Sequence, residues 1–165
     1  MRKTKGDIFQ FHKNYNDSFL CVPTNKGYTS NGYNVMGRGV AYAVKMLYPG
    51  VEITYGEVCK KRHLNNDSRN IVIMNIERLI MFPTKKLDTK NPHLSWKQDS
   101  DIGTIEQSAR ELSEFALQDD SLIFIPLVGC GNGKLNRLDV IPILKDCFKE
   151  NNNIVLVERK NTYEI

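Results

Sequence analysis

The sequence has few cysteines, and they form no known metal or redox motif. No CxxC pair occurs, which excludes a zinc ribbon and a thioredoxin-type site. Cys59 and His63 are four residues apart, but no second pair of candidate ligands stands near them in the sequence. Because structural zinc needs such a second pair, we predict no metal site and thiols that stay reduced. The four thiols are Cys21, Cys59, Cys130 and Cys147.

Long apolar runs are absent as well. The first residues, MRKTKGDIFQF, are basic but lack the apolar run of about 7–15 residues that a secretory signal contains. No stretch approaches the ~20 apolar residues that are needed to span a bilayer. We therefore expect a soluble protein of the cytoplasm, with no membrane partner.

Neither sign of charge is in large excess. The 23 Lys and Arg residues against 19 Asp and Glu residues leave a net charge of +4, and the basic residues are scattered. This balance permits a polyanionic partner, but the lack of a basic stripe argues against a plain nucleic-acid-binding protein. A chain of 165 residues suffices for one well-buried core, so we expect one domain over residues 1–165. We also expect a monomer.

Short apolar runs alternate with amphipathic segments along the chain. We predict strands at 6–11, 18–22, 70–76, 78–82, 121–128 and 153–159. We predict helices at 38–48, 51–63, 102–116 and 140–148. Gly56 weakens the second helix, and Ser100 and Asn136 are the expected N-caps of the third and fourth. The polar segment 83–100 lacks periodicity, which is typical of a functional loop.

The run at 121–128 indicates the kind of sheet. From Leu122 on it is apolar, with an interruption at Pro126, which fits a central strand covered on both faces. Strands that alternate with helices favour an α/β fold with helices on both faces of the sheet. Ligands of such folds bind at the carboxyl ends of the strands.

Two glycine-rich loops, 25–39 and 129–134, occupy strand-to-helix positions. Neither is a known nucleotide fingerprint. A P-loop would need Gly in place of Val128 and Ser or Thr in place of Leu135, and a dinucleotide motif would need Gly in place of Tyr42. Glycines still let backbone N–H groups approach an anion, and a helix N-terminus supplies free donors. Singly, each loop can be a cap or a turn; together, they are suited to clamp a diphosphate.

Four stretches in a fixed order resemble a macrodomain: GDIF, NVMGRGVAYAVKMLYPG, FPTKK and IPLVGCGNGKL. The resemblance extends from about Lys5 to Arg159. It implies a three-layer α/β/α macrodomain with a central mixed sheet, which binds ADP-ribose and needs no cofactor or metal. The most similar branch occurs in phages and in the antitoxin that removes ADP-ribose from DNA bases. A phage source would place the protein in the host-cell cytoplasm.

The resemblance also implies the binding residues. Asp7 would accept a hydrogen bond from the adenine amino group, with the backbone of Ile8 beside it. Asn25 and Asn34 would face the distal ribose, although a turn role explains Asn34 equally well. The phosphates and the distal ribose would be held by Gly37, Arg38, Gly39 and Val40 of the first loop and by Gly129, Cys130, Gly131, Asn132 and Gly133 of the second.

Lys85 is the residue that the resemblance implies as the catalyst. In related glycohydrolases a lysine at this strand end attacks or polarises the anomeric carbon of the distal ribose. A free lysine has a pKa of about 10.4, so burial or neighbouring cations must lower it. Lys86 is adjacent, and Lys134 is expected nearby. Without the resemblance, the same residues fit a solvated strand end.

The sequence departs from the family in several places. Gly133 stands where the branch that cleaves glutamate esters has an aspartate, and Lys134 stands where the antitoxin branch has a glycine. The first loop is longer by residues 26–33, and its Tyr28 and Tyr33 are suited to cover the ligand, to stack on a base or to pack as a lid. Trp96 either anchors the 83–100 loop or lines the entrance to the site.

These features predict a hydrolase that releases ADP-ribose from a nucleobase or a protein. ADP-ribosylated nucleic acid is then a possible substrate. Two alternatives remain open: a phosphatase acting on ADP-ribose-1″-phosphate, and a non-catalytic binder that sequesters ADP-ribose or a related NAD-derived nucleotide.

Overall fold

The computed structural model describes residues 1–160 and contains one six-stranded mixed sheet. The order of the strands is β1-β6-β5-β2-β4-β3; all neighbours are parallel except the antiparallel pair β3 and β4. The strands are β1 (Arg2–Lys5), β2 (Phe19–Lys26), β3 (Val72–Met74), β4 (Leu79–Lys86), β5 (Ile123–Pro126) and β6 (Ile154–Glu158).

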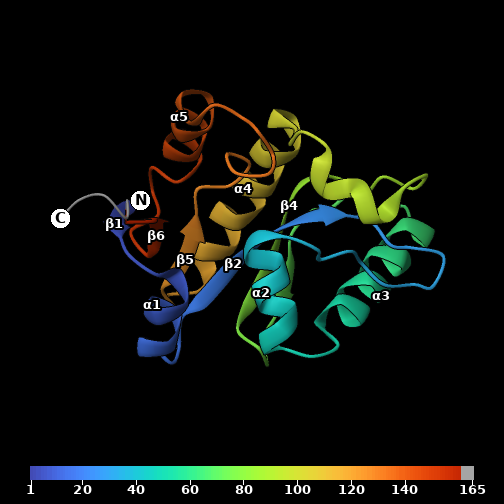
Figure 1. Ribbon diagram of the computed structural model, residues 1–165. Coiled ribbons are helices and arrows are strands. Elements are labelled where there is room, and N and C mark those ends of the chain that lie inside the picture. The colour runs from blue at the N-terminus through green and yellow to red at the C-terminus, as the bar shows by residue number, and fades with distance from the viewer. Residues whose placement is uncertain (161–165) are drawn as a thin grey trace.

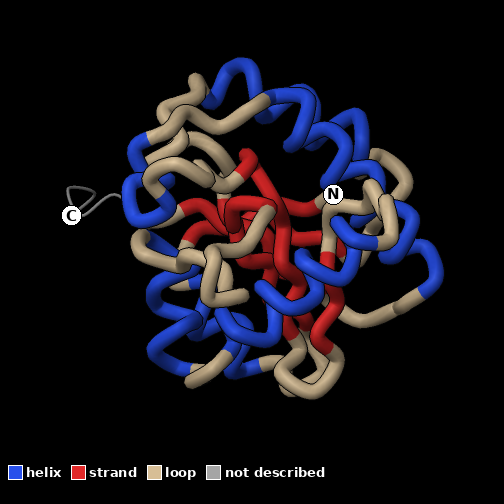
Figure 2. Tube along the Cα trace, turned by 90° about the vertical axis from the view of Figure 1, so that its right-hand side faces the viewer, coloured by secondary structure: helices blue, strands red, loops and turns tan. Residues whose placement is uncertain are grey.

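Helices cover both faces of this sheet (Figures 1 and 2). The α-helices are α1 (Ile8–Asn14), α2 (Gly39–Leu47), α3 (Val51–Leu64), α4 (Ile102–Gln118) and α5 (Arg137–Cys147), and η1 (Pro92–Lys97) is a 3-10 helix. One buried cluster joins the sheet to α1, α2 and α3, and the other joins it to α4 and α5. The three-layer α/β/α arrangement expected from the sequence is therefore confirmed.

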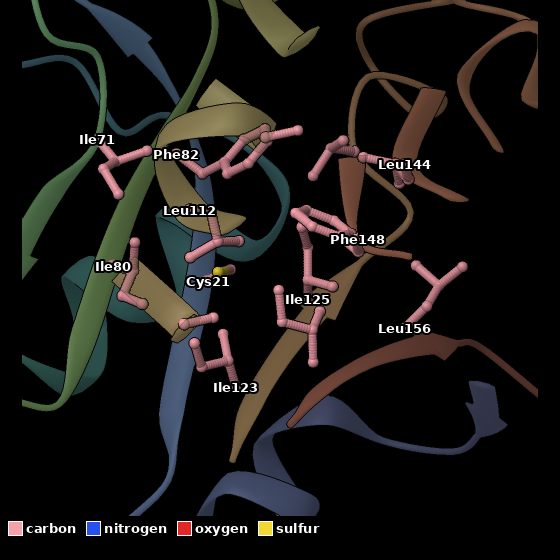
Figure 3. Packing of buried hydrophobic residues seen from close by; sticks show 14 of the residues in the cluster. Cys21, Ile71, Ile80, Phe82, Leu112, Ile123, Ile125, Leu144, Phe148 and Leu156 are labelled. Carbon is pink, nitrogen blue, oxygen red and sulfur yellow. The ribbon is translucent and has the colours of Figure 1, made fainter. Parts of the chain in front are cut away.

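Strand β2 shows why its sequence is continuously apolar. Successive side chains of a strand point to opposite faces of the sheet. Phe19 and Cys21 pack in the cluster with α4 and α5, whereas Leu20 and Val22 pack in the cluster with α1, α2 and α3. Figure 3 shows the cluster with α4 and α5, in which Leu112 of α4 packs beside Cys21. A strand buried on both faces needs apolar residues at every position.

The predicted strand at residues 6–11 is wrong. The chain forms β1 before this segment and then turns into α1. Asp7 is the N-cap of α1, and its Oδ1 accepts a hydrogen bond from the backbone N–H of Phe9 at 2.9 Å. This capping bond favours the helix, and the short apolar pattern of the segment fits either state.

The segment at 83–100 is more ordered than expected. Its first residues continue β4 to Lys86, and η1 forms its later part. The N-cap of α4 is Asp101 instead of Ser100, since an Asp101 carboxylate oxygen accepts the Thr104 N–H at 2.7 Å. The Ser100 hydroxyl donates instead to Thr84 Oγ1 at 3.1 Å. Ser100 therefore joins the loop to β4.

The remaining predicted elements are present, although β3 and β5 are shorter than expected. Asn136 caps α5 as predicted, through the backbone N–H of Leu138. Gly56 lies inside α3, where an added Cβ would stand 2.4 Å from both Gly32 O and Tyr33 Cα. A glycine in this helix thus lets the 27–34 loop lie directly against α3. Within residues 1–160, none of the helices has both the length and the apolar character needed to cross a membrane.

Candidate functional site

A cavity of about 610 Å³ opens where four parallel strands end. Its wall includes the last residues of β2, β4, β5 and β6, the N-terminus of α2 and the 127–133 loop. A second cavity of about 600 Å³ adjoins it and shares Val40, Pro126, Val157 and Arg159 as lining residues. Both volumes lie in the range of about 300–1,000 Å³ that is usual for small-molecule sites. The position agrees with the rule for ligand sites in open α/β sheets.

Almost all of the sequence-predicted site residues line these cavities. Asp7 and Ile8 line the second cavity. The first is lined by Asn25, Gly37, Arg38, Gly39, Val40, Lys85, Gly129, Cys130, Gly131, Asn132 and Gly133. Asn34 lines neither cavity.

The first glycine loop leaves backbone donors free at the start of α2. Arg38 is the N-cap in an extended conformation, and no side chain caps this helix end. Gly39 has a positive φ of 59°, which glycine adopts without strain. A Cβ on Gly39 would stand 3.6 Å from Asn132 Nδ2, so the two loops lie next to each other. The unpaired N–H groups of a helix N-terminus attract anions such as phosphate.

The second loop depends on glycine for its shape. Gly129 has a φ of 74°, and its carbonyl accepts the Leu135 N–H at 3.0 Å. A Cβ on Gly133 would stand 2.1 Å from Ser100 Oγ and 2.6 Å from the Gly129 carbonyl oxygen. An aspartate therefore does not fit at position 133 in this loop, which explains the departure from the branch that cleaves glutamate esters.

Asn34 holds Asn25 in place. The Asn34 Nδ2 donates to Asn25 Oδ1 at 2.7 Å and to the Gly27 carbonyl at 2.8 Å. The Asn25 Nδ2 donates to the Val35 carbonyl at 2.8 Å, and Tyr55 of α3 donates to the Asn25 carbonyl at 3.1 Å. Asn34 as a whole is 2% exposed, and it is not among the residues that line the cavity where its ribose contact was expected. Its position favours the turn role.

The inserted tyrosines also lie away from the cavities. The Tyr28 hydroxyl is hydrogen-bonded to His63 Nδ1 at 2.8 Å, and Tyr33 lies against α3 at Gly56. His63 is thus paired with a tyrosine, and Cys59 is buried. Among residues 1–160, no group of three or more His, Cys, Asp or Glu side chains is arranged to hold a metal ion.

Lys85 occupies the end of β4 in the wall of the first cavity. Its Nζ donates to the Gln98 carbonyl at 2.6 Å. Burial lowers the pKa of Lys85, the nearby Asp99 carboxylate opposes this shift, and the charge of Lys134 adds to it. The expected proximity of Lys134 is therefore confirmed. A lysine with a lowered pKa is more often neutral, and a neutral amine is a nucleophile.

Lys134 is held in a glycine-like conformation. Its φ is 57°, in the left-handed region that glycine adopts most easily. Its Nζ donates to the Lys97 carbonyl at 3.0 Å and stands 3.2 Å from Asp99 Oδ1. The lysine thus keeps the backbone shape of the glycine expected from the family and adds a cation beside Lys85.

Two pairs of residues at the cavity were not found from sequence. The guanidinium of Arg38 lies 4.3 Å from the centre of the Trp96 ring, and both residues line the cavity. Trp96 therefore lines the cavity, which agrees with one of the two roles considered for it. Arg137 at the start of α5 pairs with Glu158 at the end of β6, at 3.2 Å. No sequence signal joins this second pair, because its members meet only through the fold.

Comparison with curated proteins relates the sequence to enzymes that act on ADP-ribosylated DNA. No model of a known protein family matches the chain. It is 27% identical over 134 residues to a DNA ADP-ribosyl transferase–DNA ADP-ribosyl glycohydrolase fusion protein of Thermosipho africanus. The aligned region covers 69% of this chain and 32% of that protein. It is 27% identical over 127 residues to a DNA ADP-ribosyl glycohydrolase of Mycobacterium tuberculosis, covering 74% and 34%. The chain thus spans about a third of the length of these relatives.

Solved structures give the same relationship at the level of the fold. The macrodomain of Mycobacterium tuberculosis DarG superposes with a TM-score of 0.71 at 21% identity, covering 98% of this chain and 97% of that one. Thermosipho africanus DarTG in complex with ADP-ribose superposes with a TM-score of 0.70 at 23% identity, covering 100% and 43%. The fold is thus that of a macrodomain. These relatives are bacterial, and a phage source stays a prediction.

Proposed function

Because this chain has the macrodomain fold and is related to DNA ADP-ribosyl glycohydrolases, we propose that it binds ADP-ribose and releases it from an ADP-ribosylated acceptor. We take a nucleobase as the first candidate acceptor and a protein as the second. The observation that carries the proposal is the position of Lys85: a half-buried lysine with a lowered pKa in the wall of the cavity that contains both glycine loops.

In the proposed binding mode, the ligand extends across both cavities. The adenine occupies the second cavity, where one oxygen of Asp7 is used for the Phe9 N–H and the other is available to the adenine amino group. The diphosphate lies between the two glycine loops, which are next to each other at Gly39 and Asn132. The distal ribose then reaches Asn25 and Lys85.

The proposed chemistry takes place at C1″ of the distal ribose. The neutral Nζ of Lys85 forms a bond to C1″ as the bond from C1″ to the acceptor breaks; the acceptor keeps the electron pair and takes up the proton that Nζ loses. Water then adds at C1″ and releases the lysine, so that one water is consumed in each cycle. Binding of the distant adenosine and phosphates holds C1″ near the amine, which lowers the barrier to attack.

Turnover of a panel of substrates tests this function. The panel contains ADP-ribose linked to a DNA base, to a glutamate side chain and to a serine side chain, together with ADP-ribose-1″-phosphate. The Lys85→Ala variant should keep its ADP-ribose affinity and lose release of ADP-ribose by at least about 100-fold, the usual contribution of a covalent or acid–base catalyst. Lys86→Ala is the matched control, because Lys86 is exposed, adjacent and outside the cavity lining.

The same panel separates the alternatives. A phosphatase would release phosphate from the 1″-phosphate alone and would not depend on Lys85. A non-catalytic binder would bind ADP-ribose and turn over none of the four substrates. Failure of the wild-type protein to bind ADP-ribose at millimolar concentration would contradict the proposed function as a whole.

A further inference from the structure

The segment 92–99 reaches the first cavity through Trp96. It contains η1 and the residues after it, and it carries Trp96 in the cavity lining. Trp96 is half-buried, with the Arg38 guanidinium 4.3 Å and the Lys97 Nζ 5.4 Å from its ring centre. A large aromatic ring is thus held at the edge of the site by contacts with two cations.

Lysines of the site fix the position of this segment. Lys85 donates to the carbonyl of Gln98, and Lys134 donates to the carbonyl of Lys97. Lys134 also pairs with Asp99. When Lys85 turns towards C1″, its bond to Gln98 is lost, and Lys134 still joins the segment to the second glycine loop. Lys134 is therefore suited to keep Trp96 in place during the reaction.

We propose that Trp96 binds the acceptor base of an ADP-ribosylated nucleic acid strand, and that Lys97 and Lys134 bind the phosphates of that strand. This inference rests on the proposed function and names the residues that select the acceptor. Single strands bind where aromatic side chains stack on bases and cations follow the backbone. Trp96 and the exposed Arg38 line the cavity, and two more exposed cations, Lys97 and Lys134, lie next to Trp96 outside the lining.

The charge around Trp96 favours a nucleic acid over a peptide. Asp99 pairs with Lys134 and neutralises part of the positive charge, but Arg38 and Lys97 have no carboxylate partner among the ion pairs of residues 1–160. A strand with one phosphate for each nucleotide complements such a surface, and it gains affinity by releasing counterions.

Binding to four ligands tests the inference. The ligands are free ADP-ribose, an ADP-ribosylated nucleoside, the same nucleoside within a single-stranded oligonucleotide, and an ADP-ribosylated peptide. The first three ligands add the base and then the phosphates to a common ADP-ribose group, and the peptide replaces the nucleic acid by another acceptor. All variants are made in a Lys85→Ala background, which removes the proposed catalyst and keeps the conjugates intact, and dissociation constants are measured at several salt concentrations.

Trp96→Leu should weaken binding of the nucleoside and the oligonucleotide by about 5- to 150-fold relative to free ADP-ribose, the range for one base stacked on an aromatic ring. Trp96→Phe should restore most of that loss. Leu94→Ala is the matched control: Leu94 is a large exposed side chain of the same 3-10 helix and is outside the cavity lining. Equal losses for all four ligands would show that Trp96 only supports the cavity wall and would overturn the inference.

Lys134→Gly should weaken binding of the oligonucleotide more than that of the nucleoside, because it removes a phosphate contact as well as a bond that holds the Trp96 segment. It should also make the salt dependence of oligonucleotide binding shallower by about 0.7 in the slope of log K against log salt. Glycine suits the left-handed backbone at this position, so the variant should fold. Lys13→Ala on α1 removes the same charge outside the cavity lining and should change none of the four affinities. A peptide conjugate that loses as much as the oligonucleotide would overturn the inference. Loss of wild-type binding to ADP-ribose itself would instead contradict the proposed function.

Discussion

Asn25 lies opposite Lys85 in the pairing of β2 with β4, directly after a shift of register between Thr24 and Asn25. Bulges of this kind bend a strand locally and redirect its side chains, and they are common beside active sites. Here the shift brings the residue expected at the distal ribose next to the proposed catalyst. The side-chain oxygen of Asn25 accepts a hydrogen bond from Asn34, and its backbone carbonyl accepts one from Tyr55. The 25–34 loop and α3 therefore both determine the position of Asn25.

The charges beside Lys85 should shift its pH dependence in opposite directions. Lys134 lowers the pKa of Lys85, and Asp99 raises it. If the neutral amine is the active form, activity rises as pH increases through this pKa. Lys134→Gln should therefore move the rising limb of kcat/KM to higher pH, and Asp99→Asn should move it to lower pH. Shifts in the same direction would contradict the role of these charges.

Asn34 should matter for stability as well as for binding. Asn34→Ala removes the donor for Asn25 Oδ1 and for the Gly27 carbonyl in a buried setting. A buried unsatisfied group costs about 1–3 kcal/mol, so the free energy of unfolding in urea should fall by about that amount. ADP-ribose affinity should also fall, because Asn25 is no longer held. Asn31→Ala, at an exposed site of the same loop, should change stability by less than about 0.5 kcal/mol.

Gly56 should not tolerate even one methyl group. Alanine is preferred to glycine inside a helix by about 1 kcal/mol. A Cβ at position 56, however, would stand 2.4 Å from the backbone of the 27–34 loop. Gly56→Ala should thus destabilise the protein by about 1–3 kcal/mol through overpacking. The control is Gly103→Ala in α4, where the nearest atom is 3.5 Å away; thermal unfolding should show it to be neutral or stabilising.

The second glycine loop should reject the aspartate of the glutamate-ester branch. In Gly133→Asp the new Cβ would clash with Ser100 and with the Gly129 carbonyl. The loop would have to move, so we expect lower stability and loss of ADP-ribose binding by calorimetry. Gly131→Ala should keep its stability, because a Cβ there meets nothing within 4 Å and its φ is not left-handed. A Gly133→Asp protein that is stable and binds normally would refute this account of the loop.

Much of this architecture was accessible from the sequence. The periodicity of apolar residues identified the four longest α-helices and most strands, because burial on one or both faces repeats along an element. The glycine loops were found from their places after apolar strands, and Lys85 was found only from the resemblance to a family. The extent of the domain over residues 1–165 and the monomeric state stay predictions.

The errors arose where local chemistry allowed two outcomes. Asp7 can precede a strand or cap a helix, and its bond to Phe9 decides for the helix. Ser100 and Asp101 are both good N-caps, but the Ser100 hydroxyl is hydrogen-bonded to Thr84. Asp101 therefore caps α4. The choice at residues 6–11 is not visible in the sequence because the short apolar pattern fits either state. The choice between Ser100 and Asp101 is not visible because it depends on Thr84, which comes from β4.

The sequence by itself determined the layers of this protein and the two loops at the strand ends, since both follow from residue types along one segment. Only the tertiary structure decided which side chains meet at the cavity. Asn34 donates a hydrogen bond to Asn25, and the inserted tyrosines lie against α3. Trp96 comes from a distant loop and lies beside Arg38. The physical reason is that these contacts join residues far apart in the chain, and their geometry is set by the packing of whole elements around the sheet.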